Sequence, residues 1–269
     1  MKSKEEIIKN EEAFHDEWAE SINPEDVLVG ESFMGSTSPE GVWIIKTLGD
    51  LKGKRILELG SGAGEGAVFM AKQGADVTAT DLSSGMLEVV KKVAAIHDVS
   101  VATKVASAED LSGFEDNSFD IVYAANLLHH VDIAKCLDEV KRVLKPDGRG
   151  AFWDPVAHNP VINVYRKMAE DVRTPDEHPI RRQDMKLFRE RFSETKYNFF
   201  WFTSLIVFIK FWLIDRIHPS SDRYWKLIIT KEKELRPMVS KFMAVDRFII
   251  KVLPILGWWC WNIAIVVRK

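Results

Sequence analysis

Two acidic residues and a run of glycines mark the stretch where side chains of chemical interest are most concentrated. Residues 56–64 read ILELGSGAG, in which Glu58 is followed by glycines at positions 60, 62 and 64. An apolar run that meets glycines and then a helix-compatible segment indicates a strand, a tight turn and a helix, as in nucleotide sites. Asp81 follows about twenty residues later, where a carboxylate can accept hydrogen bonds from both hydroxyls of a ribose.

Glu58, the acidic residue before the turn, helps to distinguish between two kinds of ligand, a dinucleotide and S-adenosylmethionine. A dinucleotide fingerprint counted from Gly60 requires a third glycine where this chain has Glu65, and a carboxylate there disfavours a pyrophosphate. Glu58 also repels phosphates, but it suits a ligand that carries an ammonium and a sulfonium group. The pattern therefore predicts S-adenosylmethionine, which leaves as S-adenosylhomocysteine after it has given up its methyl group.

Candidate proton acceptors follow the predicted fourth and fifth strands. His129 lies in LLHHV and Asp154 in WDPVAHNP, and open α/β sheets bind ligands beyond the carboxyl ends of such strands. These two residues are the leading candidates for a general base, if the acceptor must lose a proton. The histidines show no HExxH or similar ligand spacing, so we predict no metal. The other histidines that could act as the base are His15, His130, His158 and His178.

Short apolar runs alternate with segments of helical period along most of the chain. This alternation predicts parallel strands joined by right-handed helical crossovers, which form a doubly wound α/β sheet. The runs that read as strands are residues 56–59, 76–80, 100–105, 119–124, 150–153, 194–202 and 262–269.

These motifs together resemble the class I S-adenosylmethionine-dependent methyltransferases, in their small-molecule (type 11-like) branch. LELGSGAG resembles the family's first motif and ATDLSSGML its second. Residues 105–131 resemble the segment that closes on adenine and forms the fourth strand, EVKRVLKPDGRGAF resembles the run into the fifth, and NIAIVVRK the last, antiparallel strand. The resemblance implies a Rossmann-like, mostly parallel seven-stranded sheet with helices on both faces.

The resemblance also implies which residues bind the cofactor. One departure is Ser107, where the family often has an aspartate; a hydroxyl accepts from the adenine amino group more weakly than a carboxylate does. The cofactor-binding residues implied are Glu58, Gly60 and Gly62 beside the methionine part, Asp81 at the ribose, Ala108 and Glu109 at the adenine, Asn126 near the methionyl group, and Ser61 and Leu82 to complete the set.

Composition excludes some classes of function. The chain has 269 residues, a net charge of −3 and a pI near 6.2, so it offers no general basic field for nucleic acid. Cys136 and Cys260 belong to no CxxC pair, which suits a reducing compartment. The charged N-terminal segment lacks the apolar core of a signal peptide. We therefore expect a cytoplasmic protein, with or without contact to the inner face of a membrane.

The predicted organisation is a core with two additions. We expect an N-terminal helical lid in residues 1–40, a Rossmann-like core in residues 41–202 and 260–269, and a hydrophobic helical insert in residues 203–259. The insert contains LIVFIKFWLI, YWKLII and FIIKVLPILGWW, which look helical. The first is too short to span a bilayer, and the third is interrupted by lysine and proline.

Three interpretations of the insert remain open. Its helices could pack on the core or on a second subunit of a homo-oligomer, or lie at a membrane interface as a peripheral contact. They could also enclose a lipophilic acceptor. The candidate walls of such an enclosure are Trp201, Phe211, Trp212 and Trp225.

The methyl acceptor is read from the parts outside the shared motifs. The apolar insert favours a small or medium lipophilic acceptor, such as an isoprenoid, a quinone, a sterol-like molecule or a lipid. One alternative is a sugar or glycolipid hydroxyl contacted by Arg173, Asp176, Arg181 and Arg182. Another is a non-catalytic S-adenosylmethionine-binding protein or assembly partner, because a glycine loop alone does not establish catalysis.

Overall fold

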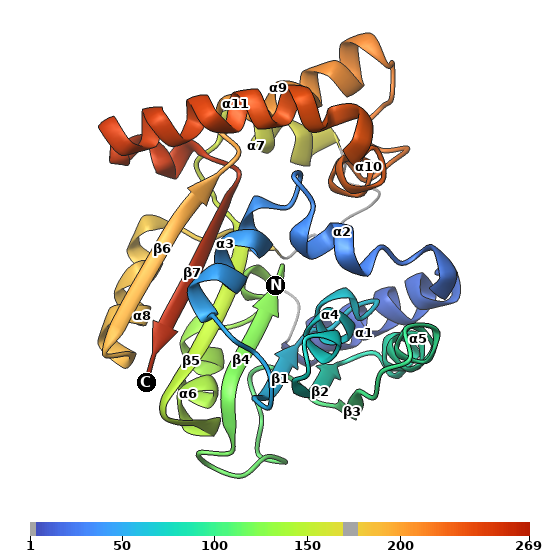
Figure 1. The fold of residues 1–269 in the computed structure, drawn as a ribbon, viewed down its shortest axis with the longest axis vertical. Coiled ribbons are helices and arrows are strands. Elements are labelled where there is room, and N and C mark those ends of the chain that lie inside the picture. The colour runs from blue at the N-terminus through green and yellow to red at the C-terminus, as the bar shows by residue number, and fades with distance from the viewer. Residues whose placement is uncertain (1–3, 169–176) are drawn as a thin grey trace.

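A seven-stranded sheet runs through the structure, with helices on both of its faces (Figure 1). The computed structural model describes residues 4–168 and 177–269. The strand order is β3, β2, β1, β4, β5, β7, β6, and β7 is antiparallel to both of its neighbours. The predicted mostly parallel, Rossmann-like sheet is confirmed. The strands are β1 (Arg55–Leu59), β2 (Asp76–Asp81), β3 (Ala102–Val105), β4 (Phe119–Ala125), β5 (Leu144–Pro155), β6 (Glu194–Phe200) and β7 (Asn262–Arg268).

The helices fall into two groups, one on each face. Residues of α3, α4 and α5 pack into one hydrophobic core, and residues of α6 and α8 pack into the other. Outside the first group, α1 contacts α5, and α2 contacts α3 and α4. These helices and α7 are α1 (Lys4–Glu20), α2 (Val29–Met34), α3 (Pro39–Leu48), α4 (Glu65–Lys72), α5 (Ser84–Ile96), α6 (Ile133–Val143), α7 (Pro160–Met168) and α8 (Met185–Arg191).

The central strands contribute to both cores at once. In β1, Ile56 packs into the core of α3 to α5, whereas Leu57 packs into the core of α6 and α8. In β4, Tyr123 likewise packs into the core of α3 to α5, and Val122 packs into the core of α6 and α8. Successive side chains of a strand point to opposite faces, so a strand covered on both faces must be apolar throughout. This is why these strands appear in the sequence as unbroken apolar runs.

The start of β5 differs from the prediction. The sequence predicts a strand at residues 150–153 after a stop, but β5 already begins at Leu144, which pairs with Phe119. The ladder then shifts and resumes with Arg149 opposite Ile121. The residues between Leu144 and Arg149, where the sequence indicates a stop, interrupt the ladder within one longer strand. Among them Asp147 has a φ of 63°.

The insert between β6 and β7 is helical, as predicted, but its longest helix starts earlier than expected. α11 runs over Glu232–Val252, whereas the sequence indicates a helix only from residue 248. The other elements are α9 (Ile206–Ile209), a π-helical turn (Lys210–Ile214), α10 (Tyr224–Thr230) and a 3-10 helix (Pro254–Trp259). Within the described ranges, no helix is long and apolar enough to cross a membrane.

A buried carboxylate attaches α11 to the start of the insert. Asp246 accepts hydrogen bonds from the backbone N–H groups of Phe202, Thr203 and Ser204 at 3.0, 2.7 and 3.3 Å. The hydroxyls of Thr203 and Ser204 donate to it as well, at 2.5 and 2.6 Å. The first N–H groups of a helical segment have no hydrogen-bond acceptor within that segment. Asp246 supplies this acceptor to the first N–H groups of the insert.

We predict that Gly257 is required where the insert returns to the sheet. A Cβ at this position would overlap the ring of Phe199 on β6. Gly257→Ala should therefore lower the free energy of unfolding by about 1–3 kcal/mol through overpacking. Gly30 in α2 is the matched control: a Cβ there meets nothing within 4 Å, so Gly30→Ala should not destabilise the protein. Urea denaturation measures both, and equal stability of the two variants would contradict the prediction.

Candidate active site

A cavity of about 410 Å³ lies beyond the carboxyl ends of the parallel strands. This volume falls within the usual range for small-molecule sites, roughly 300–1,000 Å³. Its walls come from the loops after β1, β2, β4 and β5, from α1, and from the insert. The fold therefore brings together segments from both ends of the chain around one site.

The turn after β1 has the backbone that its glycines allow. Gly60 and Gly62 have φ values of 63° and 50°, in the left-handed region that other residues rarely adopt. A Cβ on Gly60 would also lie 2.8 Å from Leu127 Cδ1. Both glycines line the cavity, so backbone rather than side chain faces a ligand here.

Glu58 is a buried carboxylate at the wall of the cavity. Its side chain packs against Gly66, where a Cβ would overlap Glu58 Oε1. The other oxygen, Oε2, is buried and has no hydrogen-bond partner among the described residues. Burial raises the pKa of Glu58 well above its usual range, and the neighbouring Glu65 raises it further. A ligand with positive charge would offset this cost, as expected for an ammonium and a sulfonium group.

Asp81 joins the loop after β2 to the loop after β1. Its Oδ2 accepts a hydrogen bond from Gly62 N and its Oδ1 from Ser83 N, both at 3.0 Å. Burial raises the pKa of Asp81, and these two backbone N–H groups act in the opposite direction. Each carboxylate oxygen can accept a further hydrogen bond, which leaves capacity for the two ribose hydroxyls.

All nine residues predicted to bind the cofactor line this one cavity. Glu109 has structural partners as well: its Oε1 accepts from Asp132 N at 3.0 Å, and its backbone N–H donates to the Ser107 hydroxyl at 3.2 Å. The hydroxyl of Ser61 is buried without a hydrogen-bond partner in the described part of the chain. The cavity thus offers orphaned polar atoms to a ligand. The nine are Glu58, Gly60, Ser61, Gly62, Asp81, Leu82, Ala108, Glu109 and Asn126.

The two predicted catalytic residues form a pair, but only one of them reaches the cavity. His129 lines it, whereas Asp154 lies behind His129 and is 1% exposed. Asp154 Oδ1 is 2.6 Å from His129 Nδ1 and accepts from the His129 backbone N–H at 3.2 Å. Burial raises the pKa of Asp154 to about 7. An aspartate at Nδ1 favours the tautomer in which Nε2 can accept a proton.

The other histidines separate into two classes. His15 and His130 line the cavity, whereas His158 and His178 are exposed and lie outside its lining. Burial lowers the pKa of His15, and the charges of Asp81 and Glu11 act against this.

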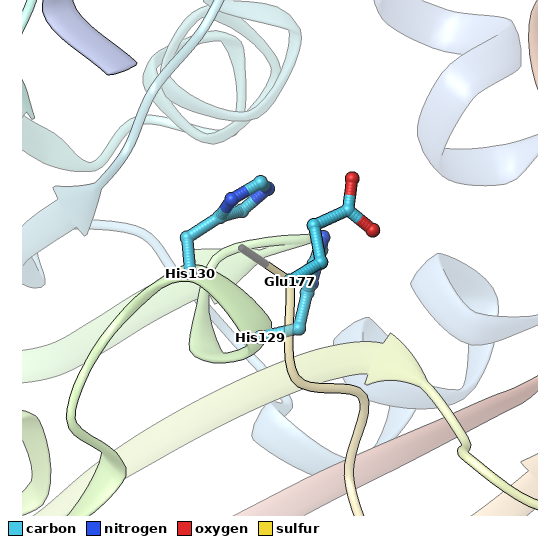
Figure 2. Close-up of side chains that lie close together, drawn as sticks. All are labelled: His129, His130 and Glu177. Carbon is cyan, nitrogen blue, oxygen red and sulfur yellow. The ribbon is translucent and has the colours of Figure 1, made fainter. Parts of the chain in front are cut away.

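The fold brings together three residues that could ligate a metal, which the sequence argument missed. His129, His130 and Glu177 each offer one ligand atom, and these atoms lie within 4.8 Å of one another (Figure 2). Two histidines and a carboxylate can bind a divalent cation or act together in proton transfer. Arg166 lies 3.9 Å from the Glu177 carboxylate. No short sequence motif indicates this cluster, because Glu177 lies far from the histidine pair in sequence.

Other cavity residues also went unrecognised in the sequence. Three lie on one face of α1, at positions 11, 14 and 18, a helical spacing that could have indicated this face. The Arg223 guanidinium lies 4.1 Å above the ring of one of them, Trp18. Burial lowers the pKa of Arg166 to about 10. The unrecognised cavity residues include Glu11, Phe14, Trp18, Tyr123, Arg166, Glu177 and Arg223.

The aromatic residues predicted to enclose an acceptor are placed differently from one another. Trp201 and Trp225 line the cavity, with Ile228 of α10 beside them in the lining. Phe211 is fully buried in the core and Trp212 is 47% exposed, so these two assignments as cavity walls were wrong. The cavity lining therefore includes aromatic and apolar side chains of the insert and of the chain next to it.

Comparison with known proteins agrees with this geometry. Residues 57–152 match the family model described as "Methyltransferase domain". These residues form a class I S-adenosylmethionine-dependent methyltransferase domain. They contain β2, β3 and β4 and most of β1 and β5, with the loops that carry the predicted cofactor site.

Two curated relatives match part of the chain. The ubiquinone biosynthesis O-methyltransferase of Alkalilimnicola ehrlichii is 36% identical over 111 residues, which cover 41% of this chain and 45% of the relative. The demethylmenaquinone methyltransferase of Clavibacter sepedonicus is 41% identical over 118 residues, covering 42% of this chain and 47% of the relative. The chain thus matches just under half of the length of each.

A solved structure extends the likeness to the whole fold. It is a Thermotoga maritima SAM-dependent methyltransferase, described as a possible histamine N-methyltransferase, and it superposes with a TM-score of 0.57 at 17% identity. The match covers 96% of this chain and 99% of that one. At this identity the likeness concerns the fold alone.

We predict that Asp81 is required for cofactor binding. Asp81→Ala removes hydrogen bonds of a charged acceptor, each worth about 1.5–3 kcal/mol, and should weaken S-adenosylmethionine binding at least about tenfold. Asp110→Ala is the control, since Asp110 is exposed and lies outside the cavity lining. Isothermal titration calorimetry, with circular dichroism to verify folding, measures both. Equal affinity in both variants would show that the ribose lies elsewhere.

Proposed function

We propose that this protein transfers a methyl group from S-adenosylmethionine to a hydroxyl of a lipophilic aromatic acceptor, of the kind found in quinone precursors. The observation that carries the proposal is that one cavity is lined by the predicted cofactor residues, by Trp201 and Trp225, and by His129. The names of the two curated relatives, both quinone methyltransferases, support the acceptor class.

The His129–Asp154 pair gives this reaction its proton acceptor. When bound, S-adenosylmethionine supplies a methyl group on a positively charged sulfur. His129 would take the proton of the acceptor hydroxyl, whose oxygen would bond to the methyl carbon as the carbon–sulfur bond breaks and its electron pair stays on the sulfur. Asp154 would stabilise the imidazolium that forms. Arg166 also lines the cavity, and its charge interacts with that of Asp154. A guanidinium so placed would favour the ionised form of the acceptor oxygen.

The sugar or glycolipid alternative receives no support from the residues predicted for it. Arg181 and Arg182 are exposed and lie outside the cavity lining. Arg173 and Asp176 lie outside the described residues. The non-catalytic alternative leaves the buried histidine–aspartate pair without a role, whereas methyl transfer to a hydroxyl uses it.

We predict that His129→Ala lowers kcat by roughly 10²–10⁴-fold and leaves S-adenosylmethionine affinity nearly unchanged. His158→Ala is the matched control, because His158 is exposed and outside the cavity lining. A labelled-methyl assay on quinone-precursor phenols measures turnover, and calorimetry measures affinity. Unchanged turnover of His129→Ala would remove this residue from the mechanism, and no transfer by the parent to any such phenol would overturn the proposed function.

The same pair should set the pH dependence of kcat/KM. Burial raises the pKa of Asp154 to about 7, and the pair must have lost a proton before it can accept one. We therefore expect kcat/KM to rise as the pH rises through about 7 and to level off above it. In Asp154→Asn this limb should move and kcat should fall. A parent profile that is flat from pH 6 to 8 would contradict this assignment.

A metal centre at His129, His130 and Glu177 is the rival explanation for the same residues. We infer that they act without a metal, because Arg166 lies 3.9 Å from the Glu177 carboxylate and its charge opposes a cation there. Incubation with excess EDTA followed by desalting should leave turnover unchanged. Loss of turnover that Mg²⁺ or Zn²⁺ restores would show instead that the three residues hold a metal.

A further inference from the structure

Exposed apolar side chains gather on the insert. Eleven of the seventeen large apolar side chains that are exposed in the described part of the chain lie between residues 206 and 259. Large exposed apolar patches on soluble proteins mark sites of interaction with a protein, a membrane or a ligand. We call these residues the insert surface: Ile206, Ile209, Trp212, Leu213, Ile214, Val245, Phe248, Val252, Leu253, Ile255 and Trp259.

The insert surface lies at one end of the molecule. α9 and α11 form the top of the view in Figure 1, beyond the sheet. On α11 the exposed members Val245, Phe248 and Val252 recur at spacings of three and four, which places them on one face of the helix. Val239 and Met243 of the same helix are buried. The helix therefore has one face in the core and a second apolar face in solvent.

The charge of the insert differs from that of the rest of the chain. Residues 203–259 hold ten lysines and arginines against five acidic residues, whereas the whole chain has a net charge of −3. Lys241, Arg247 and Lys251 of α11 are exposed and make no ion pair with any residue that the structure describes. Unpaired cations next to exposed aliphatic and tryptophan side chains suit a surface of anionic lipid headgroups over acyl chains.

The inner side of the same insert reaches the cavity. Trp225, Ile228 and Ile229 of α10 line it, together with Trp201 and Trp261 at the two ends of the insert. One structural unit thus presents apolar side chains to the cavity and to the exterior. A lipophilic molecule dissolved in a bilayer would be concentrated beside this unit.

We propose that the insert surface docks on the face of an anionic lipid bilayer. The contact is peripheral: the exposed apolar side chains enter the headgroup and acyl boundary, and the cations of α11 bind lipid phosphates. This inference does not depend on the reaction or the acceptor, because it rests on the exposed residues and the charge of the insert. Docking of this kind would be weaker on neutral lipid and at high salt.

The test is co-sedimentation of the full chain with vesicles. Vesicles of phosphatidylglycerol and phosphatidylcholine are compared with phosphatidylcholine alone. Leu213→Ser/Phe248→Ser removes two of the most exposed apolar side chains and should reduce binding to the anionic vesicles at least about tenfold. Arg247→Gln/Lys251→Gln should reduce it about 30-fold, with little effect on neutral vesicles. Ile96→Ser/Val105→Ser is the matched control, exposed to a similar degree but outside the insert.

The outcomes distinguish a bilayer from other partners. The proposal holds if the parent and the control pellet with anionic vesicles, and the two insert variants, still folded by circular dichroism, remain in the supernatant. It is overturned if the parent binds neither kind of vesicle. It is also overturned if light scattering shows a parent dimer that Leu213→Ser/Phe248→Ser converts to a monomer, since the surface would then join two copies. If the apolar variant unfolds, the charge variant decides between these outcomes.

Discussion

The hydrogen bonds accepted by Asp81 are the constraint on which the arrangement of the site depends. One carboxylate oxygen holds Gly62 N and the other holds Ser83 N, so the loops after two neighbouring strands fix each other. Ser83 in turn caps α5, its hydroxyl accepting from Met86 N at 2.9 Å. The same hydroxyl donates to Asp16 of α1 at 2.5 Å. A short series of polar contacts thus connects the glycine turn, the second loop and the N-terminal helix.

Buried carboxylates at one edge of the sheet make the free site electrostatically unfavourable. Glu58, Asp81 and Asp154 are all buried, and burial raises the pKa of each. Keeping these groups ionised in the interior would cost folding stability at those positions. A cationic ligand beside Glu58 and Asp81, which both line the cavity, recovers part of that free energy, so binding and stability are linked. The strong preference of such a site is for positive charge rather than for phosphate.

The sequence was sufficient for features that short segments determine. The turn at Gly60 and Gly62, the placement of Asp81 and the continuous apolar strands all follow from local backbone and burial requirements. The meeting of Glu177 with the histidine pair could not be predicted, because it depends on how a distant loop packs. The same is true of Phe211 and Trp212: adjacent in sequence, one is buried and the other exposed, and only the rotation of the helix in its packed position decides which.

The position of β7 has a consequence for how the chain is made. β7 lies between β5 and β6 in the sheet, yet it is the last of the three to leave the ribosome. About 62 residues separate Phe200 from Asn262, which at about 5–20 residues per second is a delay of roughly 3–12 s. During that time β6 has no strand to pair with, while the apolar helices of the insert are being synthesised. The nascent protein therefore passes through a period in which an unpaired strand and apolar helices are exposed together, a combination that favours aggregation.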